Sequence, residues 1–133
     1  FTFNPKESIS FEGETGPYLQ YSLVRAKKIK KQLKSGSKVN YNLLIHPAEQ
    51  ELIKEFSNLS SVLEKAAKTY SPHAIATYAY NLASSFNRFY ELCPVTKAEN
   101  NELQKARLVL VDSYINIMSS CLWLLGIEVV EQM

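Results

Sequence analysis

The stretch that decides the fold is PHAIATYAYNLASSFNRFYELC, residues 72–93. Its apolar residues recur at spacings of 4, 3, 4, 3 and 4: Ile75, Ala79, Leu82, Phe86, Phe89 and Cys93. These spacings keep the residues on one face of an α-helix, and an apolar face of this length needs other helices to cover it. The stretch predicts a helix from about Pro72 to Leu92 within an all-α bundle.

Four further helices are predicted from capping residues and from apolar stripes of helical period. Their ranges are about 15–33, from 46 onward, 61–70 and 100–126. We expect Thr15 to cap the first, and Ser61 with Glu64 to form a capping box at the third. The prediction is an antiparallel bundle of about five helices over residues 15–133, preceded by an irregular segment over residues 1–14.

The last of these helices holds the most apolar stretch of the chain, residues 108–125. Asp112 and several serines interrupt it, so we interpret it as a buried helix and not as a membrane span. Its inward positions are expected to be Leu103, Ala106, Leu110, Tyr114, Ile117, Cys121 and Leu124.

The composition indicates one ordinary globular domain. The chain has 133 residues, 46% hydrophobic and 21% charged, and its four glycines and five prolines are few for the turns of a sandwich or barrel. Cys93, Cys121, His46 and His73 lack zinc-site spacing, so we expect buried reduced thiols, local structural roles for the histidines and no metal. Since no phosphate-cradling glycine loop or metalloprotease motif occurs, a self-contained active site is not expected.

Charge is concentrated in one segment, because residues 25–38 carry seven basic residues and no acidic one. Such a run is either a solvated helix face or a surface for an anionic partner such as nucleic acid. The chain also has eight tyrosines, among them Tyr18, Tyr21 and Tyr90. Exposed tyrosines stack on unpaired bases, whereas buried ones pack the core. Spacing places Tyr90 and Asn87 beside the apolar stripe, where they can reach solvent.

Four blocks of the sequence, in order, resemble the C-terminal part of arginyl-tRNA synthetases, class I enzymes that attach arginine to its tRNA. The longest is SISFEGETGPYLQY at residues 8–21, followed a turn later by Arg25. The others are SFNRFY at 85–90, ARL at 106–108, and LLGIE at 124–128 before a terminal Met133. The resemblance implies an all-α anticodon-binding domain over residues 15–133, joined by residues 1–14 to a catalytic part.

The resemblance also implies a set of contacts to tRNA. The anticodon-binding residues would be Tyr18, Gln20, Tyr21, Phe86, Asn87, Tyr90 and Met133. The phosphate-binding residues would be Arg25, Lys27, Lys28, Lys30 and Lys31. The amides of Gln20 and Asn87 present both a donor and an acceptor to a base edge. The loop from Asn4 to Ser10 would approach the anticodon.

Two features depart from the family pattern. The class I catalytic signatures are missing and would lie upstream of Phe1, so this fragment should be inactive alone and hold no cofactor. The family commonly ends in P-x-[RK]-M, whereas this chain has VEQM at residues 130–133 and so lacks the basic residue before Met133. In the full-length enzyme, ATP and Mg²⁺ would serve the ligation of arginine to arginine tRNA, and we expect a cytoplasmic monomer without membrane attachment.

Two alternatives stay open at this point. One is the related helical domain of another class I synthetase, such as the cysteine or methionine enzyme, or a non-catalytic paralogue that binds RNA. The other is a helical protein-interaction module in which all tyrosines are packed.

Overall fold

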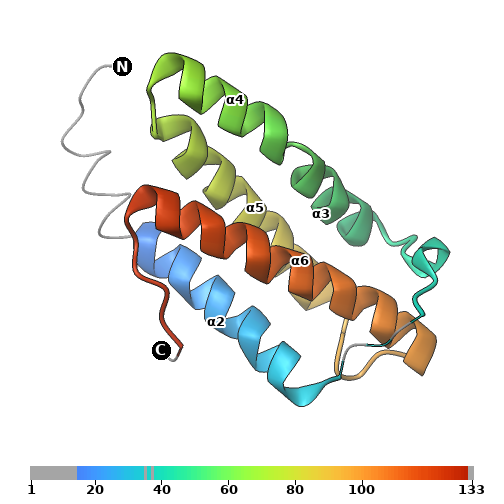
Figure 1. Cartoon of the computed structure of the whole chain (residues 1–133). Helices are drawn as coiled ribbons and strands as arrows, with labels where there is room; N and C mark the ends of the chain where they lie inside the picture. Colours follow the sequence, from blue (N-terminus) through green and yellow to red (C-terminus); the bar gives the residue numbers. More distant parts are fainter. Residues whose placement is uncertain (1–14, 35, 37, 132–133) are drawn as a thin grey trace.

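The computed structural model describes residues 15–34, 36 and 38–131, and these residues form a helical bundle (Figure 1). The elements are α2 (Gly16–Gln32), the 3-10 turn η2 (Tyr41–Leu43), α3 (Pro47–Ser57), α4 (Leu59–Thr69), α5 (His73–Leu92) and α6 (Asn101–Leu125). No strand occurs in this part of the chain, which confirms the all-α prediction. The segment 1–14 and Met133 lie outside the described residues.

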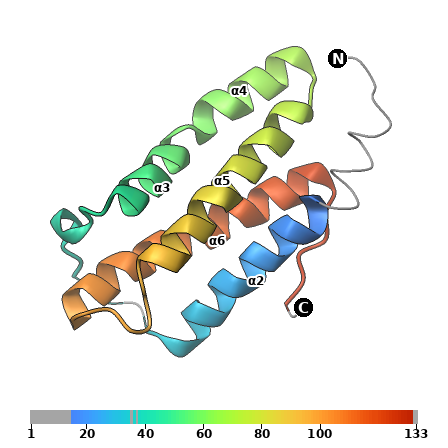
Figure 2. The ribbon, with the colours of Figure 1, turned by 180° about the vertical axis from the view of Figure 1, so that it is seen from behind.

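The bundle is built around α5 and α6. Helix α2 packs mainly on α6, while α3 and α4 cover the other side of α5 (Figures 1 and 2). Helices α3 and α4 follow each other through Asn58, whose backbone is itself right-handed helical, so the two resemble one bent helix. Helix α6 runs antiparallel to α2 and α5, as predicted, whereas α2 and α5 run parallel to each other (Figure 2).

The apolar stripe of α5 forms the centre of the core, as predicted, with all six of its residues buried. The ring of Phe86 stacks on Tyr114 of α6, with centroids 4.0 Å apart and planes 10° apart. The hydroxyl of Tyr114 lies 2.5 Å from Ser22 Oγ, and Ser22 in turn donates to the carbonyl of Leu19. This buried pair ties α6 to α2, and burial raises the pKa of Tyr114.

Helix starts differ from the prediction at two places. Thr15 has helical backbone angles and its side chain caps nothing. Helix α4 begins at Leu59, and the expected capping box is absent: Ser61 Oγ donates to the carbonyl of Asn58, and Glu64 pairs with Lys68. Because the chain is already helical at Asn58, there is no free helix start for Ser61 to cap.

A capping box does form at α3, where His46 Nδ1 accepts a hydrogen bond from the Ala48 N–H at 3.0 Å. The Glu49 carboxylate accepts in return from the His46 N–H at 2.9 Å. The local structural role expected for His46 is therefore confirmed.

The sequence leaves Asn100 or Asn101 as the cap of helix α6. The structure has Asn100, whose Oδ1 accepts from the Leu103 N–H, and the helix ends at Gly126 with a φ of 71°. The prediction for Leu124 is wrong, since this side chain is 45% exposed; at this end the inward residues are Cys121 and Leu122. The helix is long and apolar enough to cross a membrane by length and composition. Here it is the core helix that packs against α2, α3 and α5.

A buried ion pair joins three parts of the fold. Arg107 Nε on α6 donates to Glu49 Oε2 on α3 at 2.7 Å, and Arg107 Nη1 donates to the carbonyl of Pro94 at 2.8 Å. Glu49 is only 1% exposed. Cys93 and Cys121 are free and buried, as predicted, and burial raises the pKa of the Cys121 thiol to about 11.

Candidate nucleic-acid interface

The predicted aromatic residues of α2 and α5 meet where these two parallel helices touch. We call this surface the α2–α5 seam; it consists of Tyr18, Tyr21, Arg25, Tyr80, Asn87 and Tyr90. At its start the rings of Tyr18 and Tyr80 lie 5.5 Å apart. The Asn87 side chain donates from Nδ2 to the Tyr18 hydroxyl at 2.9 Å. Parallel packing thus brings the two predicted halves of the site together.

Arg25 lies at the centre of the seam. Its guanidinium carbon is 4.2 Å from the centroid of the Tyr90 ring and 5.0 Å from that of Tyr21. The guanidinium also donates to Asn87 Oδ1 and to the Tyr21 hydroxyl, each at 3.3 Å, and lies 3.9 Å from Glu91. Stacking and hydrogen bonds together fix the plane of the guanidinium between the two tyrosines.

The seam exposes aromatic rings. Tyr21 is 49% exposed and Tyr90 is 37% exposed, and this confirms the position of Tyr90 beside the apolar stripe. Tyr80, 46% exposed, extends the surface but was not predicted as a site residue. The sequence signal that could have identified it is a tyrosine directly after Ala79, a residue of the apolar stripe. The alternative in which every tyrosine is packed is wrong.

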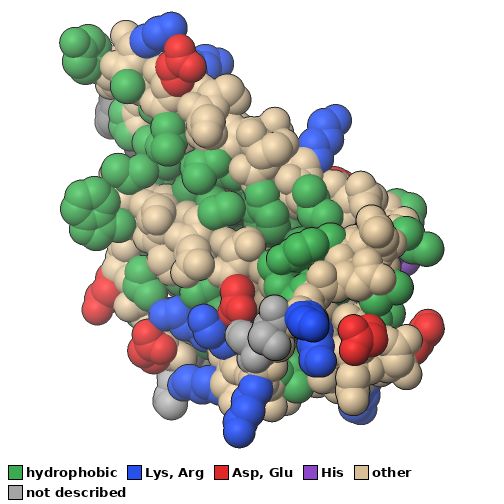
Figure 3. Space-filling model, turned by 45° about the vertical axis from the view of Figure 1, so that its right-hand side comes forward, with side chains coloured by type: hydrophobic (Ala, Val, Ile, Leu, Met, Phe, Trp, Pro, Cys, Tyr) green, Lys and Arg blue, Asp and Glu red, His purple; other side chains and the backbone are tan. Residues whose placement is uncertain are grey.

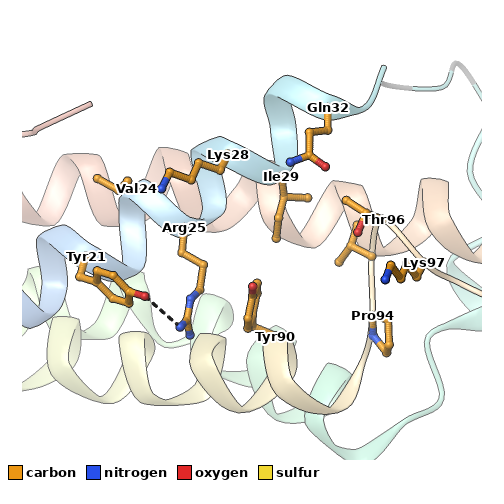
Figure 4. A pocket seen from close by; sticks show the side chains of 11 residues that line it. Tyr21, Val24, Arg25, Lys28, Ile29, Gln32, Tyr90, Pro94, Thr96 and Lys97 are labelled. Atoms are coloured by element: carbon orange, nitrogen blue, oxygen red, sulfur yellow. Dashed lines mark hydrogen bonds between the residues drawn. The ribbon is translucent and has the colours of Figure 1, made fainter. Parts of the chain in front are cut away.

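An open groove of about 410 Å³ continues the seam toward the end of α5 (Figure 4). Its described lining residues are Tyr21, Val24, Arg25, Lys28, Ile29, Gln32, Tyr90, Pro94, Val95, Thr96 and Lys97. Three of these residues are cationic and none is acidic. The predictions missed Gln32, Thr96 and Lys97. Thr96 and Lys97 lie in a loop, where the sequence has no helical period that would predict which side chains face the groove.

Two predicted residues do not face the seam. Phe86 is 0% exposed and stacks in the core, so the prediction that it forms a wall for a base is wrong; it supports the seam from behind. Gln20 is turned toward the C-terminal segment, where its Nε2 donates to the carbonyl of Glu128 at 2.9 Å. The physical reason is helical geometry, since Gln20 lies about 100° around α2 from Tyr21. Met133 is outside the described residues.

The predicted phosphate-binding lysines fall into two groups. Lys27 pairs with Glu131 at 2.8 Å and Lys30 pairs with Asp112 at 3.2 Å. The Lys27 ammonium holds the pKa of Glu131 below its usual value. Lys28 and Lys31 are exposed and take part in no ion pair within the described part of the chain.

One side of the surface is rich in these basic groups. Figure 3 shows lysine and arginine side chains in the lower part of one face, with acidic side chains between some of them. Hydrophobic side chains gather across the middle of the same face. Within the basic run, four lysines are exposed and form no ion pair with any described residue: Lys28, Lys31, Lys34 and Lys38.

Comparisons with known proteins show which proteins this chain is similar to. The chain is 39% identical over 132 residues to an arginine–tRNA ligase of Clostridium acetobutylicum and 36% identical over 137 residues to one of Methanosarcina barkeri. Each match covers 98% of this chain but only 23% and 24% of the relative. The chain thus spans about a quarter of the length of these relatives.

A solved structure, the Thermus thermophilus arginyl-tRNA synthetase, has the same fold. It matches with a TM-score of 0.84 and 33% identity, over 98% of this chain and 23% of that one. The family model for the DALR anticodon binding domain matches residues 19–133. The chain belongs to the DALR anticodon binding domain family.

Proposed function

We propose that the α2–α5 seam binds the unpaired bases of a tRNA anticodon loop, and that the chain serves as the anticodon-binding domain of an arginine–tRNA ligase. One observation carries the proposal: the exposed rings of Tyr21 and Tyr90 flank the Arg25 guanidinium beside a groove lined by cations without a carboxylate. Unpaired bases stack on such rings, and cations attract the backbone phosphates.

The side chains divide this work by their chemistry. Tyr21 and Tyr90 offer stacking faces, while Arg25 offers a planar cation that stacks and donates hydrogen bonds. Asn87 keeps one amide hydrogen beyond the bond to Tyr18, so it can donate to a base edge while it holds Arg25. The Tyr18 hydroxyl holds the Asn87 amide in place by accepting its other hydrogen bond.

The remaining predicted contacts lie at the margins of the seam. Lys28 and Lys31 attract phosphate directly, while Lys27 and Lys30 contribute to the field from within their ion pairs. Gln20 and Met133 would contact RNA from the side of the C-terminal segment.

The relatives reported above are arginine–tRNA ligases, which favours arginine tRNA as the partner over the tRNA of the cysteine or methionine enzyme. ATP-dependent ligation of arginine would require the parts of those relatives that this chain does not match. We place the ATP and Mg²⁺ of that reaction with those same parts. From the similarity to these ligases, we also propose that the full-length enzyme is a cytoplasmic monomer.

The proposal is tested with two RNA hairpins that share the stem of arginine tRNA. The first hairpin has the natural anticodon loop, in which the bases are unpaired. In the second, the loop bases are replaced by complementary ones that pair and extend the stem. We expect the chain to bind the open loop at least tenfold more tightly at physiological salt, because only unpaired bases can stack on Tyr21 and Tyr90. Equal affinities would reject base binding by the seam and leave only attraction to phosphate.

A further inference from the structure

The loop at residues 94–97, between α5 and α6, is held unusually firmly for a connecting segment. Three successive backbone carbonyls accept hydrogen bonds from side chains of α6. Arg107 Nη1 donates to the carbonyl of Pro94 at 2.8 Å, and Gln104 Nε2 donates to those of Val95 and Thr96, each at 3.1 Å. The carbonyl oxygens therefore point toward α6.

The anchor of this arrangement is buried. Arg107 is itself fixed by the charge of Glu49, which is 1% exposed, and Val95 is buried beneath the loop. A loop whose backbone is tied to a buried ion pair is already ordered before binding, so binding must order only its exposed side chains. Because its carbonyls are engaged, the loop also presents little negative charge to an anion in the groove.

The groove side of the loop has the opposite character. Figure 4 shows Thr96 and Lys97 on the far side of Tyr90 from Arg25, and Gln32 of α2 lines the same groove. Thr96 and Lys97 are exposed, and Lys97 forms no ion pair with any residue that the structure describes. The groove thus has a cation on each rim, Lys28 on α2 and Lys97 on the loop.

We propose that loop 94–97 is a second RNA-binding element, in which Lys97 binds a backbone phosphate of the nucleotide whose base stacks at Tyr90. The inference rests on the proposed function of the seam. It assigns a ligand, the phosphodiester of single-stranded RNA, to loop residues that lie outside every sequence motif described above. Gln32 and Thr96 offer polar groups to the same nucleotide. Gln104 is a positioning residue that acts through the loop.

The salt dependence of binding to the open-loop hairpin tests Lys97 directly. Each phosphate contact to a single strand contributes about 0.7 to the slope of log K against log salt concentration. We expect Lys97→Ala to reduce that slope by about 0.7, and Lys97→Arg to keep it because the charge stays. Lys54→Ala, an exposed lysine on α3 away from the groove, is the matched control and should keep the wild-type slope.

The positioning role of Gln104 is tested with a double variant. Gln104→Leu removes both hydrogen bonds to the loop, and we expect weaker binding to the open-loop hairpin. If Gln104 acts through Lys97, the double variant with Lys97→Ala loses no more affinity than the stronger of the two single variants. Additive losses would show that Gln104 does not act through Lys97 and would overturn this part of the inference.

The outcomes separate this inference from the proposed function. If the wild-type chain binds the open loop and Lys97→Ala leaves both its affinity and its salt slope unchanged, the loop is not a phosphate site although the seam still binds RNA. If the wild-type chain does not distinguish open from closed loops, the proposed function fails and the inference fails with it.

Discussion

Replacing Tyr90 by alanine separates base stacking from folding, because the ring lies on the surface of the seam and not in the core. Tyr90 is 37% exposed, and its covered face lies against the Arg25 guanidinium at 4.2 Å. A base stacked on an aromatic ring contributes about 1 to 3 kcal/mol, so we expect Tyr90→Ala to raise the Kd for the open-loop hairpin by about 5- to 150-fold.

The same substitution should change stability little. It removes a cation–π contact of about 0.5 to 1 kcal/mol at a partly exposed position, which lowers Tm by no more than about 6 °C. Fluorescence anisotropy with labelled hairpin measures the Kd, and circular dichroism measures Tm. Tyr90→Phe keeps the stacking face and should bind within about threefold of wild type, well under the 1.4 kcal/mol of a tenfold change.

Tyr41→Ala is the matched control, since Tyr41 is also exposed but lies in η2 outside the seam. We expect it to leave the Kd unchanged. The reasoning is refuted if Tyr90→Ala stays folded and binds as the wild type does, or if Tyr41→Ala loses as much affinity.

Three further predictions concern the core. Phe89→Ala removes a fully buried ring and should lower the free energy of unfolding by about 3 to 5 kcal/mol in urea titrations; a near-neutral result would contradict the register of α5. Arg107→Met leaves the Glu49 carboxylate buried and unpaired, which should cost about 3 to 5 kcal/mol, and adding Glu49→Gln should restore part of it. Burial raises the pKa of Tyr114, so this phenol stays neutral in the folded state while it ionises near pH 10 in the unfolded state. Stability should therefore fall as pH rises above about 10, and less so in Tyr114→Phe.

The fold followed from the sequence where the signal was long and periodic. The stripe of α5 repeats over five intervals, and all of its members are buried. Short local signals were less reliable. Ser61 and Glu64 have the spacing of a capping box, yet α3 and α4 are nearly continuous through Asn58, so no helix end exists there. At Leu124 the pattern failed because a 25-residue helix drifts relative to any fixed repeat, and its far end turns toward solvent.

The centre of the seam was predictable from the sequence, whereas the buried position of Phe86, the exposure of Tyr80 and the ion pairs of the lysines were not. Tyr21, Arg25 and Tyr90 carry the resemblance and meet in the structure. Charge along the chain gave no sign that Lys27 and Lys30 form ion pairs, because their partners, Glu131 and Asp112 of α6, lie far away in sequence.

The loop cation was hidden for a related reason. Lys97 stands alone in its stretch of sequence, and the hydrogen bonds from Gln104 and Arg107 to the preceding carbonyls, together with the burial of Val95, hold that loop beside the groove. Long-range contacts of this kind leave no periodic trace in a single sequence.

The central claim is that the seam reads unpaired anticodon bases. The most direct test compares the Kd of this chain for hairpins of arginine tRNA that differ only in the anticodon bases, at physiological salt. We expect the natural anticodon to bind at least about tenfold more tightly than altered ones, a difference of about 1.4 kcal/mol. Identical affinities, each with the same salt slope, would contradict base reading by the seam and would leave only stacking that ignores base identity and attraction to phosphate.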